Sequence, residues 1–176
     1  MTPIEEPAAP ANETRGQPVH LDVNNHEAFR TIVDVLNTLG IRTRQGEQYR
    51  QSRRGRVSLG QDNQREMSVW FMNQVRNAPD ITNTIQDNII IERATDGANL
   101  IYAHPTIARE WRDALNKANA GVEVVRVAFV YNNDPDNNWQ RAWRFQGVYR
   151  LQSAASDPLP EQLVWELIAA QFEYQA

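Results

Sequence analysis

The chain has 176 residues, of which 41% are hydrophobic, with a formal net charge of −4 and no cysteine. This length predicts one domain that buries about 70% of the surface of its unfolded chain, and without cysteine it can have no disulfide, thiol nucleophile or cysteine-ligated metal. The negative net charge gives no overall attraction to nucleic acid, and no apolar run approaches the roughly 18 residues of a membrane span, so we expect a soluble, cytoplasmic protein with no membrane partner.

The N-terminal part of the sequence divides into a tail and the first elements of a domain. Residues 1–17 are rich in proline and lack apolar periodicity, so we expect a disordered tail, followed by a single α+β domain over residues 18–176. Residues 19–23 alternate in polarity, which predicts a short edge strand. Apolar residues at helical spacing then predict a helix over residues 26–39, with Gly40 as its C-terminal stop.

The next segment, residues 41–56, has no clear periodicity, and its glycine, serine and arginine content predicts an exposed loop or an irregular hairpin. Residues 57–59 predict a brief strand. Asp62 or Asn63 can then cap a second helix, which we expect to extend to about Arg76. The inward face of this helix would carry Met67, Trp70, Phe71 and Val75.

Two apolar segments, residues 88–93 and 98–103, flank a Thr-Asp-Gly sequence that is typical of a hairpin turn. Three consecutive isoleucines in the first segment favour a strand that is covered on both faces. A third helix is predicted to begin at Pro105 and to end within residues 119–121. Its apolar side would carry Ile107, Trp111, Ala114, Leu115 and Ala118.

Residues 122–151 are the best-specified part of the sequence, with two apolar arms around a loop of asparagine, aspartate and proline. The first arm is almost wholly β-branched or aromatic and the second alternates strictly, so we predict an antiparallel hairpin with a buried aromatic face. The predicted buried face carries Trp143, Phe145, Gly147, Tyr149 and Leu151. The opposite, polar face would carry Arg144, Gln146, Val148 and Arg150.

The C-terminal segment, residues 157–172, fits two interpretations. Its length, its apolar stripe and a pair of alanines favour a helix, whereas residues 163–168 alone would also fit a last strand. Together, the elements indicate an α+β fold with a mostly antiparallel sheet or open barrel and three to four flanking helices.

Signatures of catalysis and metal binding are weak. His20, Asp22 and His26 are spaced so that they could share a metal, but a polar edge strand followed by the first turn of a helix explains them better. No serine lies in a nucleophile motif beside a histidine, and no glycine-rich loop has dinucleotide or phosphate-binding spacing. We therefore predict no catalytic residue, no metal site and no cofactor.

Arginine placement is the sharpest functional signal. Seventeen of the eighteen basic residues are arginine, and six of them fall within residues 42–56, where Glu47 is the only acidic residue. Guanidinium groups bind phosphate oxygens bidentately and stack on bases, so this cluster predicts a contact with DNA. The predicted nucleic-acid-binding residues are Arg42, Arg44, Tyr49, Arg50, Arg53, Arg54 and Arg56, extended by Arg144 and Arg150 of the hairpin.

Three segments of the C-terminal third resemble the SET- and RING-associated (SRA, or YDG) domain. They are Val124-Val125-Arg126-Val127, Arg144-Phe145-Gln146-Gly147-Val148-Tyr149-Arg150 and Leu163-Val164-Trp165-Glu166, which follow the order and spacing of the family's motifs. The resemblance implies a PUA-like curved β-barrel with flanking helices, and recognition of DNA that carries a modified, flipped base. The family's Tyr-Asp-Gly reads Phe-Gln-Gly here, and its Tyr-Thr-Gly pocket motif has no counterpart, so no pocket residue is carried over.

The sequence thus predicts a DNA-binding module without chemistry of its own, and two alternatives stay open. The arginine segment could instead dock on the acidic surface of a protein partner, or scattered Asp, Glu and His residues could assemble a metal-dependent enzyme. The sequence makes no prediction of the oligomeric state.

Overall fold

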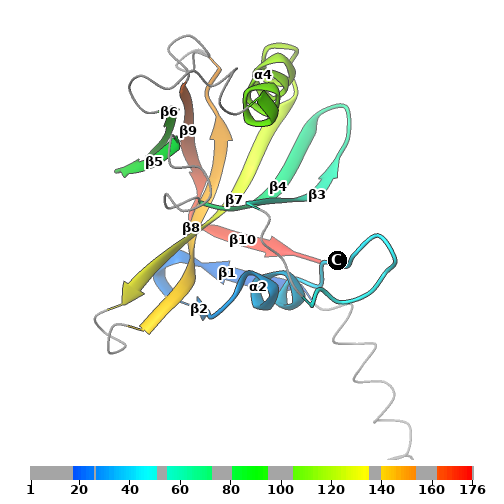
Figure 1. The fold of residues 1–176 in the computed structure, drawn as a ribbon, viewed down its shortest axis with the longest axis vertical. Coiled ribbons are helices and arrows are strands. Elements are labelled where there is room, and N and C mark those ends of the chain that lie inside the picture. The colour runs from blue at the N-terminus through cyan, green and yellow to red at the C-terminus, as the bar shows by residue number, and fades with distance from the viewer. Residues whose placement is uncertain are drawn as a thin grey trace, which may run out of the picture.

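The computed structural model describes residues 18–25, 27–50, 55–72, 81–94, 105–134, 140–153 and 162–175 (Figure 1). In chain order, the elements are β1 (Val19–Asp22), the 3-10 helix η1 (Val23–Asn25), β2 (Ala28–Phe29), α2 (Ile32–Thr38), β3 (Arg56–Gln61), β4 (Arg65–Phe71), β5 (Ile81–Gln86), β6 (Ile89–Ala94), α4 (Pro105–Asn119), β7 (Glu123–Asp134), β8 (Gln140–Leu151), β9 (Gln162–Ala169) and β10 (Gln171–Tyr174). The predicted N-terminal edge strand, the helix that begins at Pro105 and the central hairpin are confirmed as β1, α4 and β7–β8.

Eight strands form one open sheet in the order β3-β4-β7-β8-β9-β6-β5, with the short β2 paired to β8 beside this path. β4 and β7 run parallel, while the other strand pairs are antiparallel. β1 and β10 form a separate two-stranded sheet. The mostly antiparallel sheet is therefore confirmed, in an open form rather than as a closed barrel. The described residues contain two α-helices, fewer than the three to four expected.

Two hydrophobic cores lie on opposite faces of the long β7–β8 pair. We call them the α4 core, which includes Trp70, Trp111 and Trp165, and the α2 core, which includes Leu36 and Phe129. Successive residues of β7 alternate between the two cores, so both faces of this strand are covered. Figure 1 shows this pair of strands running from the part of the molecule that carries α4 to the part that carries α2.

The predicted single aromatic face of the second hairpin arm is wrong, because a β-bulge divides β8. The register shifts between Ala128 and Phe129 of β7, which leaves Gln146 as an extra residue on β8. As a result, Phe145 packs in the α2 core, whereas Tyr149 packs in the α4 core.

Gly147 makes this bulge attainable. Its φ of +136° is in a region that side chains with a Cβ rarely adopt, and a Cβ added there would lie 2.5 Å from Cδ1 of Leu167. Both the backbone conformation and the close approach of β9 therefore require glycine.

The predicted second helix, from Asp62 to Arg76, is wrong, because this segment contains strand β4. β4 lies between β3 and β7, so its consecutive residues enter different cores: Trp70 packs in the α4 core and Phe71 in the α2 core. Asp62 caps the β3–β4 turn instead, accepting hydrogen bonds from the backbone N–H groups of Gln64 (2.7 Å) and Arg65 (2.9 Å), which lower the pKa of its carboxyl.

The predicted helix over residues 26–39 is present but begins six residues later, as α2. Thr31 caps it by accepting a hydrogen bond from the backbone N–H of Asp34 at 3.1 Å. The preceding residues pair with β8 as β2. Leu36 and Leu39 of the predicted apolar stripe are buried, but so is Val35, which was not part of it. Pairing with β8 takes the first residues out of the helix.

The C-terminal segment forms strand β9, so the preferred helix is wrong and the alternative strand over residues 163–168 is confirmed. β9 pairs with β8 on one side and β6 on the other, and Leu163 and Trp165 are fully buried. Apolar spacing alone cannot distinguish such a doubly paired strand from a buried helix.

The predicted strand at residues 88–93 is confirmed as β6, but its hairpin partner is β5, through a turn at Asp87. β9 pairs with β6 on its other side. Residues 98–103, the expected partner, lie outside the described residues. Of the three isoleucines, Ile90 is buried and Ile89 is 42% exposed, so this strand is not covered on both faces as expected. Neither α2 nor α4 combines the length and apolar character needed to cross a membrane.

Candidate nucleic-acid interface

The arginine loop, residues 41–56, is anchored to α2 through its described part. Asn37 of α2 donates a hydrogen bond to the Tyr49 carbonyl and accepts one from the Tyr49 N–H, both at 3.1 Å. A bridge between Arg42 and Gln48 closes an irregular hairpin, as predicted. The half-buried Tyr49 ring packs against the α2 core, so this residue anchors the loop.

The charged groups of the arginine loop fall into two classes. Arg42, Arg44 and Arg50 are exposed, and no carboxylate of the described residues lies within ion-pair distance of them. Arg56 is half-buried and its guanidinium lies 3.3 Å from the carboxylate of Glu66, which Lys117 also contacts. Arg53 and Arg54 lie outside the described residues.

The two hairpin arginines do not share a solvated face, because the bulge in β8 separates them. Arg144 is 9% exposed and lies between β2 and β7, across from Ala28 and Val130. Arg150 forms ion pairs with Glu166 and, at 3.6 Å, with Glu123. The hydrogen bond to Glu166 raises the pKa of Arg150.

A buried glutamate–arginine pair that the sequence analysis did not single out lies in the α4 core. Glu92 of β6 and Arg126 of β7 are 8% and 4% exposed, with 3.4 Å between the carboxylate Oε1 and the guanidinium Nη1. The guanidinium carbon lies 4.8 Å from the ring centroid of Trp70 and 4.1 Å from that of Trp165. We refer to these four residues as the Glu92 cluster.

Burial dominates the electrostatics of the Glu92 cluster. It raises the pKa of the Glu92 carboxyl, while the charge of Arg126 acts in the opposite direction. It also lowers the pKa of Arg126, against the opposing charge of Glu92. The indole N–H of Trp165 also favours the ionised carboxyl, although it forms no hydrogen bond of standard geometry within the described residues.

Both members of the ion pair are nearly inaccessible. The side chain of Glu92 is 11% exposed and that of Arg126 is 5% exposed. Moving a charged group from water into an apolar core costs free energy unless the group is paired. A charged residue in an apolar strand such as Ile-Ile-Ile-Glu therefore requires a buried partner or a function. This sequence signal could have identified Glu92.

The residues considered for a metal site are only partly described. His20 is exposed, and the Asp22 carboxylate accepts hydrogen bonds from the Asn24 backbone N–H (2.9 Å) and the Gln171 amide (3.0 Å). His26 lies outside the described residues. Within the part of the chain that is described, no three His, Asp or Glu residues are grouped so as to hold a metal ion.

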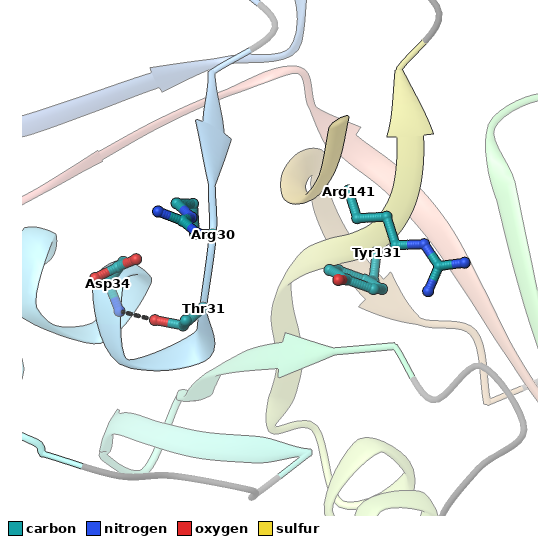
Figure 2. Close-up of a pocket in the computed structure, with 5 residues that line it drawn as sticks. All are labelled: Arg30, Thr31, Asp34, Tyr131 and Arg141. Atoms are coloured by element: carbon teal, nitrogen blue, oxygen red, sulfur yellow. Dashed lines mark hydrogen bonds between the residues drawn. The ribbon is translucent and has the colours of Figure 1, made fainter. Parts of the chain in front are cut away.

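A polar hollow of about 500 Å³ lies between α2 and the β7–β8 hairpin (Figure 2). Its lining residues are Arg30, Thr31, Asp34, Tyr131 and Arg141, none of which was predicted as a site residue.

Comparison with known proteins extends the resemblance seen in the C-terminal third to nearly the whole chain. The model of the SRA family, the SET and RING associated domain, matches residues 17–174. No curated protein matches.

Among solved structures, the chain is similar to one described as the 5-hydroxymethylcytosine-specific restriction enzyme AbaSI. The two share 20% sequence identity and a TM-score of 0.59, over 99% of this chain and 48% of that chain. This chain therefore spans about half the length of that enzyme, and the likeness shows a common fold.

Proposed function

The chain belongs to the SET and RING associated domain family, and from this premise we propose that it is a DNA-binding module that reads a modified cytosine flipped out of the duplex. SRA domains bind DNA and flip modified cytosines. The observation that carries the proposal is the family match over residues 17–174, which includes every element of the fold. The similar fold of an enzyme specific for 5-hydroxymethylcytosine supports it.

The arginine loop supplies the phosphate contacts in this proposal. The exposed guanidinium groups of Arg42, Arg44 and Arg50 are not neutralised by carboxylates of the described residues, so they are free to bind a polyanion. We extend the same role to Arg53 and Arg54 on the basis of their place in the sequence. Phosphate contacts fix the position of the DNA but carry no information about the base.

The Glu92 cluster supplies the base contact. An ionised carboxylate accepts a hydrogen bond from the exocyclic amino group of cytosine, and a protonated carboxyl can donate one to the ring nitrogen. Arg126, whose guanidinium packs against the rings of Trp70 and Trp165, would hold the Glu92 carboxyl in one orientation. Arg126 is thus a positioning residue, and Glu92 is the group that meets the base.

A binding titration tests this function. Duplexes of one sequence, carrying cytosine, methylcytosine or hydroxymethylcytosine at one position, are titrated with the full chain at low and at moderate salt. We expect tighter binding of at least one modified duplex, with a preference that persists as salt reduces all affinities. Equal affinity for the three duplexes would refute base reading, and no binding at low salt would refute the DNA-binding role itself.

A further inference from the structure

Strand pairing fixes the backbone on both sides of the hollow between α2 and the β7–β8 hairpin. Arg30 directly follows β2, whose Phe29 pairs with Trp143 of β8, and Arg141 lies two residues before Trp143 on the same strand. Strand pairing therefore fixes the backbone positions of the two arginines relative to each other. In Figure 2, Arg30, Thr31 and Asp34 lie on one side of the hollow and Tyr131 and Arg141 on the other, with the Arg141 guanidinium directed past the Tyr131 ring and away from Arg30.

The chemistry of the lining favours an anion. Arg30 and Arg141 are exposed, and no described carboxylate is within ion-pair distance of either guanidinium. Asp34 is the one acidic residue of the lining, so the hollow carries one net positive charge.

Tyr131 provides a neutral hydrogen-bond donor between the two arginines. Its half-buried ring is supported by Trp143, with 5.1 Å between the ring centroids. Its hydroxyl points toward the wall formed by the start of α2 (Figure 2). A phosphate oxygen on the Arg30 side of the ring would meet this hydroxyl donor in addition to an arginine.

The hollow and the arginine loop lie at opposite ends of α2. Arg30 precedes the N-terminal end of α2, while Asn37, near its C-terminal end, is bonded to Tyr49 of the loop. The seven residues of α2 span about 10 Å, roughly the axial rise of three phosphates on one DNA strand. The hollow and the loop thus lie at the two ends of a helix whose length suits consecutive phosphates.

We propose that this hollow is a second phosphate-binding site, which holds the backbone of the DNA strand that the arginine loop contacts. Arg30 and Arg141 each bind a backbone phosphate, and the Tyr131 hydroxyl donates to one of them. The Asp34 carboxylate repels phosphates that approach its side of the hollow and so limits the affinity. This inference rests on the proposed function, because it requires that the chain binds DNA.

The test is a titration of the full-length variant Arg30→Gln/Arg141→Gln with modified and unmodified duplexes over a series of salt concentrations. Loss of two phosphate contacts should weaken binding of both duplexes by about tenfold at low salt and reduce the slope of log affinity against log salt by about 2. The ratio of affinities for modified and unmodified duplexes should stay unchanged, because phosphate contacts do not read the base. The matched control is Arg109→Gln/Arg112→Gln, which removes two exposed arginines from α4, with no expected effect.

A gain of affinity gives an independent test. Asp34→Asn removes the acidic group while keeping a similar shape, and it should tighten DNA binding a few-fold at low salt. If the wild-type chain binds DNA, but the arginine variant keeps its affinity and salt slope, or the α4 control weakens binding equally, the hollow is not a phosphate site. If the wild-type chain binds no duplex at all, the proposed function itself fails, so the two failures are distinguishable.

Discussion

At the scale of single residues, the Glu92–Arg126 pair dominates the physical chemistry of the domain. Both groups are almost fully buried, and the 3.4 Å separation is long for an ion pair, so attraction compensates desolvation only in part. The two tryptophan rings, whose centroids are 5.7 Å apart, each add a cation–π contribution to the guanidinium. Such a pair stabilises little in total, but loss of one member leaves an unpaired buried charge.

The raised pKa of Glu92 should make the stability of the domain depend on pH. Because the pKa is raised in the folded state above its ordinary value of 4.5, the contribution of this group is fully present below pH 4.5 and is lost as the pH rises through the raised value. Glu92→Gln should remove this dependence, so the stability of the variant relative to wild type should improve with rising pH in this range. Chemical denaturation of both proteins at a series of pH values measures the effect, and parallel curves would contradict it.

Removal of the partner should be costly at neutral pH. Arg126→Met keeps the volume of the side chain but leaves the Glu92 carboxyl without its cation, which should lower the free energy of unfolding by about 3–5 kcal/mol. In the double variant Arg126→Met/Glu92→Gln, much of this loss should be recovered. Denaturant titration at neutral pH is the measurement, and a double variant no more stable than Arg126→Met would argue against the pairing.

The same carboxyl should control selectivity for the base. With Glu92→Gln, the charge-assisted hydrogen bond to the base is lost, so the preference for the modified duplex should fall by about tenfold. Salt-dependent binding to the unmodified duplex should be retained, since the phosphate contacts are intact. A uniform loss for both duplexes would instead indicate a structural role for Glu92.

At the scale of elements, the bulge in β8 decides which core each hairpin residue enters. Gly147 and Gly60 both have strongly positive φ values, of +136° and +132°, but only Gly147 is in tight contact. Gly147→Ala should therefore destabilise the domain by about 2–4 kcal/mol through strain and overpacking together, and Gly60→Ala only by the smaller cost of strain. Thermal unfolding of the two variants provides the comparison, and equal losses would contradict the contact between β8 and Leu167.

The arginine loop is the second element with a testable role. Arg42→Gln/Arg44→Gln/Arg50→Gln should reduce the salt slope of DNA binding by about 3, since each phosphate contact contributes about 0.9. The melting temperature should change little, because the three side chains are exposed and make no described ion pair. An unchanged salt slope would show that these three arginines do not contact DNA phosphates.

At the scale of the whole molecule, β7 and β8 join the two cores. β7 contributes alternate residues to each core. β8 contributes Phe145 to the α2 core before the bulge and Tyr149 to the α4 core after it, so a change that disrupts these strands affects both cores. The β1–β10 sheet adds Leu21 and Phe172 to the α2 core and so brings both ends of the described chain into it. The family model matches residues 17–174 and so covers all of these elements, not the C-terminal motifs alone.

Several functional and structural features could be predicted from local patterns. Helix α4, the β7–β8 hairpin, the edge strand β1 and the loop character of residues 41–50 followed from periodicity, turn residues and composition. The family resemblance also followed from short sequence motifs. Two residues of those motifs, Arg126 and Trp165, are in contact in the α4 core. The exposed arginines of the loop were visible as a cluster because they are adjacent in the sequence.

Only the tertiary structure decided which strands are central, which side chains are buried together and where polar groups from distant segments meet. β4 and β9 have apolar residues that fit a helix, and they are strands because neighbours on both sides supply their hydrogen bonds. The ion pair of Glu92 with Arg126, and the placement of Arg30 and Arg141 around one hollow, depend on strand pairing and register. Sequence spacing records local geometry, whereas contacts between distant segments depend on how the whole chain packs.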